Sequence, residues 1–133
     1  MTNKLAITTV PLTESPVPER RRVENRGEMA IIVDGQPFCH LKCLTIKKGH
    51  SRGGHYHKKK MEQVYLFSGK IRITWLDLAS TEKGQAELGR GQKVKITPQL
   101  AHVYEALEDS LLIEYCNVKY DVEDDVRFAL TTS

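Results

Sequence analysis

The sequence predicts an all-β domain, and three features support this prediction. Short segments rich in β-branched and aromatic residues recur along the chain, with turn residues between them. Strong helix signals are scarce, and 133 residues are enough for one domain only. We therefore expect a sandwich or barrel. A double-sheet jelly roll is the arrangement that removes most free sheet edges while it encloses a small cavity.

The first segment, residues 1–27, is expected to form an extended arm because it carries Pro11, Pro16 and Pro18. Two strands are predicted next, at residues 29–33 and 38–46. The Asp34–Gly35 pair between them favours a hairpin. Further strands are expected at residues 55–57, 63–67, 71–77, 86–88, 94–97, 102–106 and 111–119.

The last segment, residues 120–133, is expected to be an acidic tail with a short helical turn. Asp121 is a suitable N-cap for one or two turns within residues 122–130. Glu123, Asp124 and Asp125 would then lie near the positive end of the helix dipole.

Composition narrows the function classes. Hydrophobic residues make up 40% of the chain and charged residues 28%, and no apolar stretch approaches the roughly 20 residues of a membrane span. The first residues lack the apolar region of a secretory signal, so we expect a cytoplasmic protein with no membrane partner. The net charge of +3 does not imply nucleic acid, and no basic groove with stacked aromatics is evident. Cys39, Cys43 and Cys116 are expected to be reduced, buried residues.

Three histidines and one glutamate form a candidate metal site. His55 and His57 alternate around Tyr56, so in a strand both rings face one side and Tyr56 faces the other. Glu62 opens the next β-prone run, and His102 follows a proline turn later in the chain. These donors suit Fe(II), Mn(II), Ni(II), Cu(II) or Zn(II). The alternative is an ordinary exposed strand end beside lysines, which the spacing of the other donors argues against.

Basic residues flank the two neighbouring histidines. Arg52, Lys58 and Lys60, together with Lys59, can hold a phosphate or carboxylate of a small anionic ligand. Strand alternation also places Tyr104 on the same face as His102. Tyr104 is therefore a candidate general acid/base or substrate-orienting group, and equally a half-buried strand aromatic.

The pattern Gly-x5-His-x-His-x4-Glu-x6-Gly between Gly49 and Gly69 resembles the complete first motif of the cupin superfamily. The resemblance covers roughly residues 28–119 and implies a small jelly-roll barrel. It also implies that the barrel carries a bound divalent transition metal such as Fe, Mn, Ni or Zn. The implied metal ligands are His55, His57, Glu62 and His102.

The segment from Gly91 to His102 resembles the second cupin motif, with two departures. Thr97 stands where a first proline is usual, and Gln99 stands where a glycine is usual. The histidine ligand is retained, and the turn before it is expected to be less tight.

A narrower resemblance is to the small cupins of nucleotide-sugar metabolism, the sugar 3,4-ketoisomerases and their epimerase relatives. The stretch from Arg52 to Lys58 resembles their Arg-Gly-x-His-x-His-Lys segment, and the tail at residues 120–127 also fits. This resemblance implies that His55 and His57 act as acid/base groups without a metal, beside a sugar ketone. The tyrosine of those isomerases on the preceding strand has no counterpart at residues 42–44.

Three hypotheses for function follow. The first is a metal-binding cupin with isomerase-like or epimerase-like activity on a small oxygen-rich substrate, such as a sugar or nucleotide sugar. The second is a non-haem metal-dependent dioxygenase, which uses the same ligand types. The third is a non-catalytic module that binds a small ligand. Cupins often pair through an edge strand or an exchanged arm, so we expect a homodimer.

Overall fold

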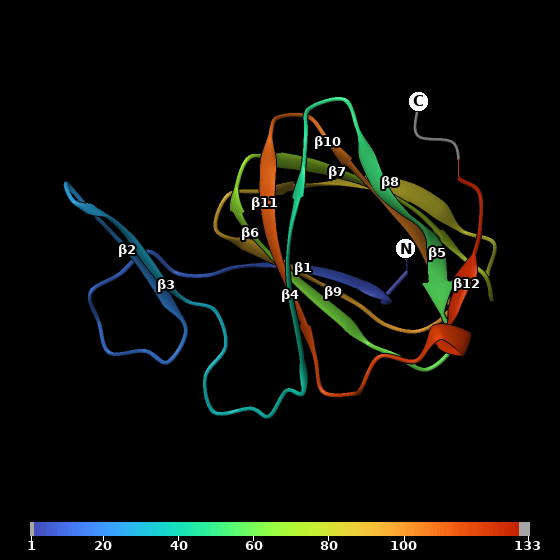
Figure 1. Ribbon diagram of the computed structural model, residues 1–133, viewed down its shortest axis with the longest axis horizontal. Helices are drawn as coiled ribbons and strands as arrows, with labels where there is room; N and C mark the ends of the chain where they lie inside the picture. Colours follow the sequence, from blue (N-terminus) through green and yellow to red (C-terminus); the bar gives the residue numbers. More distant parts are fainter. Residues whose placement is uncertain (1, 131–133) are drawn as a thin grey trace.

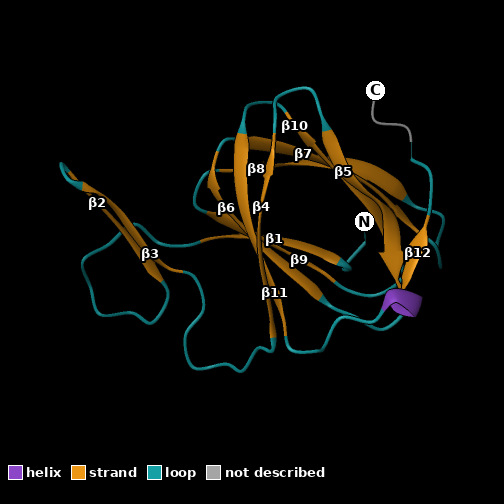
Figure 2. Cartoon of the chain, in the orientation of Figure 1, coloured by secondary structure: helices purple, strands orange, loops and turns teal. Residues whose placement is uncertain are grey.

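The computed structural model describes residues 2–130 and shows two antiparallel sheets packed face to face as a jelly roll (Figure 1). The prediction of an all-β jelly-roll barrel is therefore confirmed. Strands account for nearly all of its regular structure (Figure 2).

The first sheet contains, in spatial order, β1 (Leu5–Thr9), β9 (Gln92–Ile96), β6 (Glu62–Ser68), β11 (Ser110–Cys116) and β4 (His40–Ile46). The second sheet contains β12 (Asp125–Arg127), β5 (Ser51–His57), β10 (Leu100–Ala106), β7 (Lys70–Asp77) and β8 (Lys83–Gly89). Strands next to each other along the chain often belong to different sheets, so the chain crosses the barrel repeatedly. This crossing brings motif residues of separate strands to one interior.

The core lies between the two sheets because strand alternation points apolar residues inward. In β7, for example, Ile71, Ile73 and Trp75 are buried, while the residues between them are partly exposed. These three side chains pack in one cluster with residues of the opposite sheet, such as Leu66 and Leu112. The motif residues are therefore mounted on rigid, paired backbone.

The predicted hairpin between residues 29–33 and 38–46 is wrong. Instead β3 (Gly27–Ile31) pairs with β2 (Arg20–Glu24) in a separate two-stranded sheet, and β4 pairs with β11. The Asp34–Gly35 pair lies in a longer connection between the ribbon and the barrel. Pairing with β11 lets β4 bury Ile46 in the barrel core, which a local hairpin cannot do.

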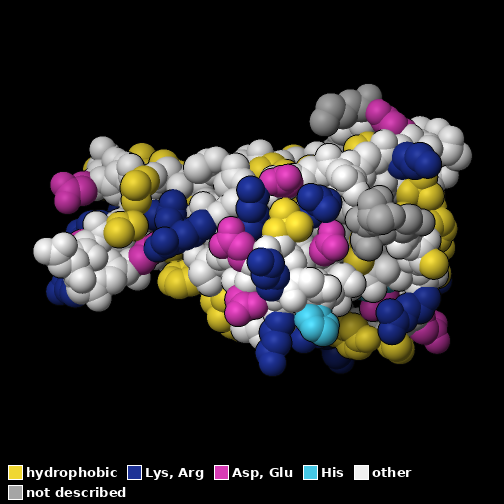
Figure 3. Space-filling view, turned by 90° about the horizontal axis from the view of Figure 1, so that it is seen from above, with side chains coloured by type: hydrophobic (Ala, Val, Ile, Leu, Met, Phe, Trp, Pro, Cys, Tyr) yellow, Lys and Arg dark blue, Asp and Glu magenta, His cyan; other side chains and the backbone are white. Residues whose placement is uncertain are grey.

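The β2–β3 ribbon projects from the barrel (Figure 1) and is held at its base by ion pairs. The carboxylate of Glu28, on β3, accepts a hydrogen bond from Nε of Arg21 at 2.9 Å. The same carboxylate forms an ion pair with Arg90 in the turn between β8 and β9. Lys93 of β9 contacts Glu19 at 2.6 Å, just before β2. Apolar and basic side chains lie together on the projecting part (Figure 3).

The C-terminal segment forms a helical turn as predicted, but a shorter one. A 3-10 turn covers Val122–Asp124, and the carboxylate of Asp121 caps it by accepting the Glu123 N–H at 3.0 Å. The chain then becomes β12, which pairs with the edge of β5. Pairing satisfies the backbone groups of that edge, which a continued helix would leave open. Residues 131–133 of the expected acidic tail lie outside the described residues.

Two other sequence predictions concern burial and membrane contact. The three cysteines are free thiols, but only Cys116 is buried, whereas Cys39 and Cys43 are exposed, so their predicted burial is wrong. Among residues 2–130 no helix is long and apolar enough to cross a membrane.

Candidate functional site

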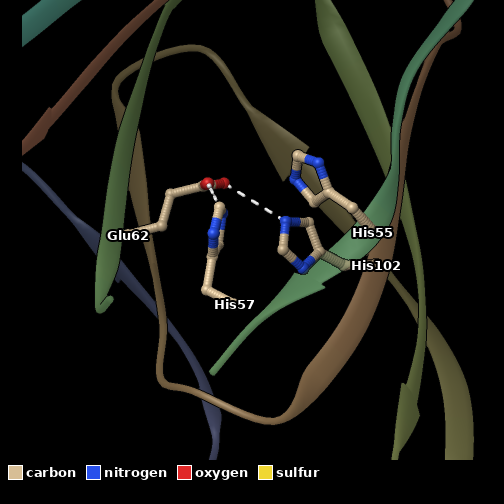
Figure 4. A group of neighbouring side chains, drawn as sticks. All are labelled: His55, His57, Glu62 and His102. Atoms are coloured by element: carbon tan, nitrogen blue, oxygen red, sulfur yellow. Dashed lines mark hydrogen bonds and ion pairs between the residues drawn. The ribbon is translucent and has the colours of Figure 1, made fainter. Parts of the chain in front are cut away.

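The four predicted ligands come together inside the barrel. His55 and His57 lie on β5, His102 faces them from the neighbouring β10, and Glu62 starts β6 in the opposite sheet. One donor atom from each of the four lies within 4.8 Å of the others, and the side chains converge (Figure 4). The predicted alternation holds, because Tyr56 points away and its ring packs 6.2 Å from the ring of Phe128.

A glycine permits the close approach of β5 and β10. Gly53 has φ of +105°, and a Cβ there would lie 3.0 Å from the carbonyl oxygen of His102 and 3.2 Å from the Cα of Val103. The register of the two strands shifts at this point, as a β-bulge does. The shift places His55 directly opposite His102, with ring centroids 4.9 Å apart.

Glu62 is the centre of the site and is 2% exposed. Its Oε1 lies 3.2 Å from Nε2 of His57, its Oε2 lies 3.3 Å from Nε2 of His102, and the Tyr104 hydroxyl donates to Oε2. Burial alone would raise the pKa of Glu62. The attraction of His102 and these hydrogen bonds outweigh burial and hold the pKa well below its usual range. Glu62 is thus an anion enclosed by donors.

The negative charge of Glu62 also shifts the pKa values of the groups around it. Burial, and then the Glu62 carboxylate, raise the pKa of Tyr104 well above its usual range, so the phenol stays protonated at neutral pH. Burial lowers the pKa of His102, but Glu62 outweighs burial and the pKa is raised. Burial, together with the repulsion of His102, lowers the pKa of His55 to about 4. His55 is therefore neutral at pH 7 and able to accept a proton.

Each imidazole turns its Nδ1 toward an acceptor outside the cluster. Nδ1 of His102 lies 2.9 Å from the carbonyl oxygen of Leu100. Nδ1 of His55 lies 3.1 Å from Oδ1 of Asp125, and Nδ1 of His57 lies 3.8 Å from Oδ2 of Asp124. At His55 and His102 the acceptor within 3.1 Å of Nδ1 favours a proton there and leaves the Nε2 lone pair for the centre, which is how metal-binding histidines are commonly oriented; Asp124 is too far from His57 for a hydrogen bond.

The donor set fits a divalent transition metal. Nε2 of His102 is fully buried and, among the described residues, makes no aligned hydrogen bond, although the Glu62 carboxylate is only 3.3 Å away. A lone pair facing a carboxylate at that distance needs a proton or a cation between them. His55, His57, Glu62 and His102 are the residues that would hold the ion.

A cavity in two lobes adjoins the cluster. The first lobe, of about 200 Å³, includes Arg52, His55, Glu62 and Tyr104 in its wall. The second, of about 220 Å³, extends past His55 and Glu62 toward the tail. The second lobe is also lined by His40, Lys42, His57, Lys60, Glu114, Tyr120 and Asp125. A small substrate in either lobe would contact the cluster directly.

The three predicted substrate-binding residues have different surroundings. Arg52 lines the first lobe, and its Nε donates to the carbonyl oxygen of Thr45 at 3.1 Å. Lys60 is buried in the wall of the second lobe, with Nζ 3.3 Å from Oε2 of Glu114. Lys58 is exposed and is not among the described residues that line either lobe.

Four further residues reach the site without having been singled out as site residues from the sequence. Asp125 and Asp124 approach from the tail, and Asp124 also accepts the backbone N–H groups of Lys59 (2.7 Å) and Lys60 (3.0 Å). Lys42 and Glu114 line the cavity from β4 and β11. The resemblance of the tail to the sugar ketoisomerases is the sequence signal that pointed to the two aspartates. We find no comparable signal for Lys42 and Glu114.

The turn before His102 is tight despite its two departures from the cupin motif. Gln99 adopts φ of +70°, the left-handed conformation that glycine usually supplies. Its N–H donates to the carbonyl oxygen of His57 at 2.8 Å and so ties the two motifs together. The expectation of a looser turn is therefore wrong.

Comparison with known proteins places this chain in a family. Residues 22–125 match the polysaccharide biosynthesis C-terminal domain family, and the chain belongs to that family. No curated protein matches the chain in sequence.

Solved structures share the fold at low sequence identity. A mutant of the 3,4-ketoisomerase QdtA from Thermoanaerobacterium thermosaccharolyticum, in complex with TDP-4-keto-6-deoxyglucose, has a TM-score of 0.76 at 18% identity over 96% of this chain and 89% of that chain. The dTDP-4-dehydrorhamnose 3,5-epimerase from Sulfolobus tokodaii has a TM-score of 0.73 at 19% identity, with coverages of 94% and 77%. The capsular polysaccharide assembling protein CapF from Staphylococcus aureus has a TM-score of 0.64 at 22% identity, over 90% of this chain but 35% of that one. The chain therefore has the cupin fold of nucleotide-sugar isomerases and epimerases.

Proposed function

We propose that this protein is an isomerase or epimerase that moves a proton on a keto sugar carried by a nucleotide. The observation that carries this proposal is that His55, oriented by Asp125, and the protonated phenol of Tyr104 line the same small cavity. A base and an acid facing one cavity are what keto–enol chemistry requires. Two of the solved structures named above, the 3,4-ketoisomerase and the 3,5-epimerase, are named for reactions on substrates of this class, which supports the choice.

The proposed chemistry begins with two proton transfers, which convert the ketone into an enol. His55 takes the proton from the carbon next to the ketone, and that electron pair forms a carbon–carbon double bond. The carbonyl oxygen then takes a proton from Tyr104. For isomerisation, His55 returns its proton to the former carbonyl carbon, while the hydroxyl on the adjacent carbon gives its proton to the Tyr104 phenolate and becomes the new ketone. For epimerisation, a proton from solvent adds to the opposite face of the original carbon, the enol oxygen returns its proton to Tyr104, and His55 releases its proton to solvent. Either outcome restores both side chains. Asp125 stabilises the imidazolium that forms in between.

We also propose that His57, Glu62 and His102 would hold a divalent transition metal, with His55 as a fourth ligand only while it is not acting as the base, because its Nδ1 faces Asp125 and its one free lone pair, on Nε2, cannot serve both roles. Such an ion would supply a Lewis acid that polarises a substrate oxygen. The test is metal content by mass spectrometry on protein purified without a metal-binding tag. Near-stoichiometric metal in the wild type, lost in His57→Ala and retained in His50→Ala, is the expected result. His50→Ala is the matched control because His50 lies outside the cluster.

A second candidate is the same proton transfer without a metal, and the surroundings of Glu62 favour it. The carboxylate already has Tyr104 as a hydrogen-bond donor and two imidazoles within 3.3 Å, and a protonated His102 neutralises its charge. Metal absent from the wild type, with undiminished turnover in the presence of a chelator, would select this candidate over the metal-dependent one.

Turnover is tested with TDP-4-keto-6-deoxyglucose in D₂O. Proton NMR should show loss of the signal of the proton next to the ketone as deuterium enters from solvent. We expect His55→Asn and Tyr104→Phe to slow this exchange by about 10²-fold or more. Lys95→Ala, an exposed change on β9, serves as the control. No exchange by fully folded wild type on this or related keto nucleotide sugars would refute the enzyme and favour a non-catalytic binding module.

We propose that the protein is a homodimer through its arm and its sheet edge. The β2–β3 ribbon exposes Val23 (53%) and Met29 (40%), and β4, at the edge of its sheet among the described strands, exposes Leu41 (62%). A two-stranded ribbon is marginally stable by itself, and a second copy of the chain would cover these residues symmetrically. Light scattering should give twice the chain mass. Val23→Lys combined with Met29→Lys should lower that mass, and a monomeric wild type would contradict the proposal.

A further inference from the structure

We propose that a groove outside the barrel, at the turn between β4 and β5, binds the diphosphate of the nucleotide sugar. The groove has a volume of about 380 Å³. It is lined by Thr45, Ile46, Lys47, His50, Ser51 and Arg52. This inference rests on the proposed function, since it names where the substrate's diphosphate lies.

The size of the inner cavity favours such an extension. Each lobe, of about 200 or 220 Å³, is by itself smaller than the roughly 300–1,000 Å³ of pockets that enclose a drug-sized ligand, and the two together reach only the lower part of that range. A sugar ring beside Tyr104 and His55 would occupy one lobe, so the rest of a nucleotide sugar must lie outside. Arg52 lines both the first lobe and the outer groove, so the groove is adjacent to the lobe.

The charge of the groove suits a diphosphate. Lys47 and Arg52 are cations, His50 offers a ring N–H in either protonation state, and Ser51 adds a hydroxyl. No carboxylate occurs among the described residues that line the groove. The Nε of Arg52 is fixed to the Thr45 carbonyl oxygen at 3.1 Å, which orients the rest of the guanidinium for a bidentate contact with phosphate oxygens.

The turn that carries these groups is fixed by the strand beside it. The N–H of Gly49 donates to the carbonyl oxygen of Ala106 at 2.9 Å, and the Ala106 N–H donates to the His50 carbonyl oxygen at 3.0 Å. Asp109, the acidic residue that contacts the turn, is bound through Oδ1 to the backbone N–H of Lys48 at 2.8 Å and does not line the groove. The groove is therefore formed before any ligand arrives, which lowers the entropy cost of binding.

The other mouth of the cavity is less suited to a diphosphate. Lys42 and Lys60 lie there, but both ammonium groups contact the same oxygen of Glu114, at 3.4 and 3.3 Å. Asp125 and Glu62 add two further carboxylates to that lobe. The three carboxylates offset the positive charge of these lysines, whereas no carboxylate among the described residues that line the groove offsets that of Lys47 and Arg52.

The experiment measures TDP and pyrophosphate binding by isothermal titration calorimetry on the full chain. The main variant is Lys47→Ala combined with His50→Ala. Lys42→Ala tests the other mouth, and Lys95→Ala is the matched control for loss of one exposed lysine. We expect the double variant to weaken TDP and pyrophosphate binding by about tenfold or more. Lys95→Ala should leave binding unchanged, and Lys42→Ala should weaken it less than the double variant.

The outcomes separate this inference from the proposed function. Weakened binding in the double variant supports the groove even if deuterium exchange on the sugar is never observed. Equal binding by the double variant and Lys95→Ala overturns the proposal of a diphosphate groove. A larger loss of binding in Lys42→Ala than in the double variant also overturns it, because the diphosphate would then lie at the other mouth of the cavity. Failure of the wild type to bind either probe also overturns it. In an active enzyme, the double variant should raise KM with little change in kcat.

Discussion

The buried ion pair between Lys60 and Glu114 makes a prediction about stability that depends on which partner is removed. Nζ of Lys60 lies 3.3 Å from Oε2 of Glu114, and the two side chains are 9% and 6% exposed. Lys42 contacts the same oxygen at 3.4 Å, but its side chain is 50% exposed. Glu114 therefore has two cationic partners, whereas Lys60 depends mainly on Glu114.

Glu114→Gln should destabilise the fold more than Lys60→Met. Removing the carboxylate leaves a buried ammonium, which costs about 3–5 kcal/mol. The lower end is expected because Glu62 also attracts Lys60. Lys60→Met keeps most of the side-chain volume and leaves Glu114 paired with the solvent-screened Lys42, so its cost should be about 1–2 kcal/mol. The expected difference is about 2 kcal/mol.

Equilibrium unfolding in urea at pH 7 measures both costs. The chain has one tryptophan, Trp75, which is 6% exposed and so reports unfolding by fluorescence. Metal content is measured for each variant, so that any loss of a bound ion is separated from the loss of the pair. Lys95→Ala should lie within about 0.5 kcal/mol of wild type. Equal costs for the two variants, or a larger cost for Lys60→Met, would refute this reasoning.

Three further predictions concern other parts of the barrel. Gln99→Gly should raise the free energy of unfolding by about 0.5 kcal/mol, because the backbone strain removed at φ of +70° exceeds the cost of the greater conformational entropy of glycine in the unfolded chain. An unchanged or lower melting temperature would contradict this. Gly69→Ala should cost more than about 3 kcal/mol in urea unfolding, since its Cβ would lie 2.2 Å from Ser110 Oγ and 2.5 Å from a backbone oxygen. The control Gly35→Ala, also at positive φ but with nothing within 4 Å, should cost about 1 kcal/mol. Hydrogen bonding from Lys4, opposed by burial, lowers the pKa of Asp77 to about 2. The ionised Asp77 carboxylate therefore stabilises the fold fully above pH 3.8, the ordinary pKa of the unfolded chain, and this stabilisation is lost as the pH falls toward 2. Asp77→Asn should therefore flatten the fall in melting temperature between pH 4 and 2, and an unchanged slope would count against it.

The candidate ligands could be predicted from the sequence because their signals are local. Alternation in a strand puts His55 and His57 on one face whatever surrounds them, and the same rule puts Tyr104 on the face of His102. Glycines with positive φ mark the turns at both ends of the first motif, at Gly49 and Gly69. The all-β class followed from the same kind of short-range pattern.

Strand pairing could not be predicted in the same way. The Asp34–Gly35 pair is a good hairpin turn by local chemistry, yet β3 pairs backward with β2 and β4 pairs with β11. The energy that decides between these pairings is the burial of side chains such as Ile46 against residues far along the chain. No local pattern carries that information.

The sequence by itself determined the identity of the four candidate ligands, the strands that carry them and the type of barrel they belong to. Only the tertiary structure decided that Asp125 orients His55, that Glu114 shares its carboxylate between two lysines, and that Arg52 lines both the inner cavity and an outer groove. Alternation and turn chemistry act over a few residues, and they fix the direction of a side chain. Contacts between distant strands depend on strand order and register, which are set by the packing of the whole barrel.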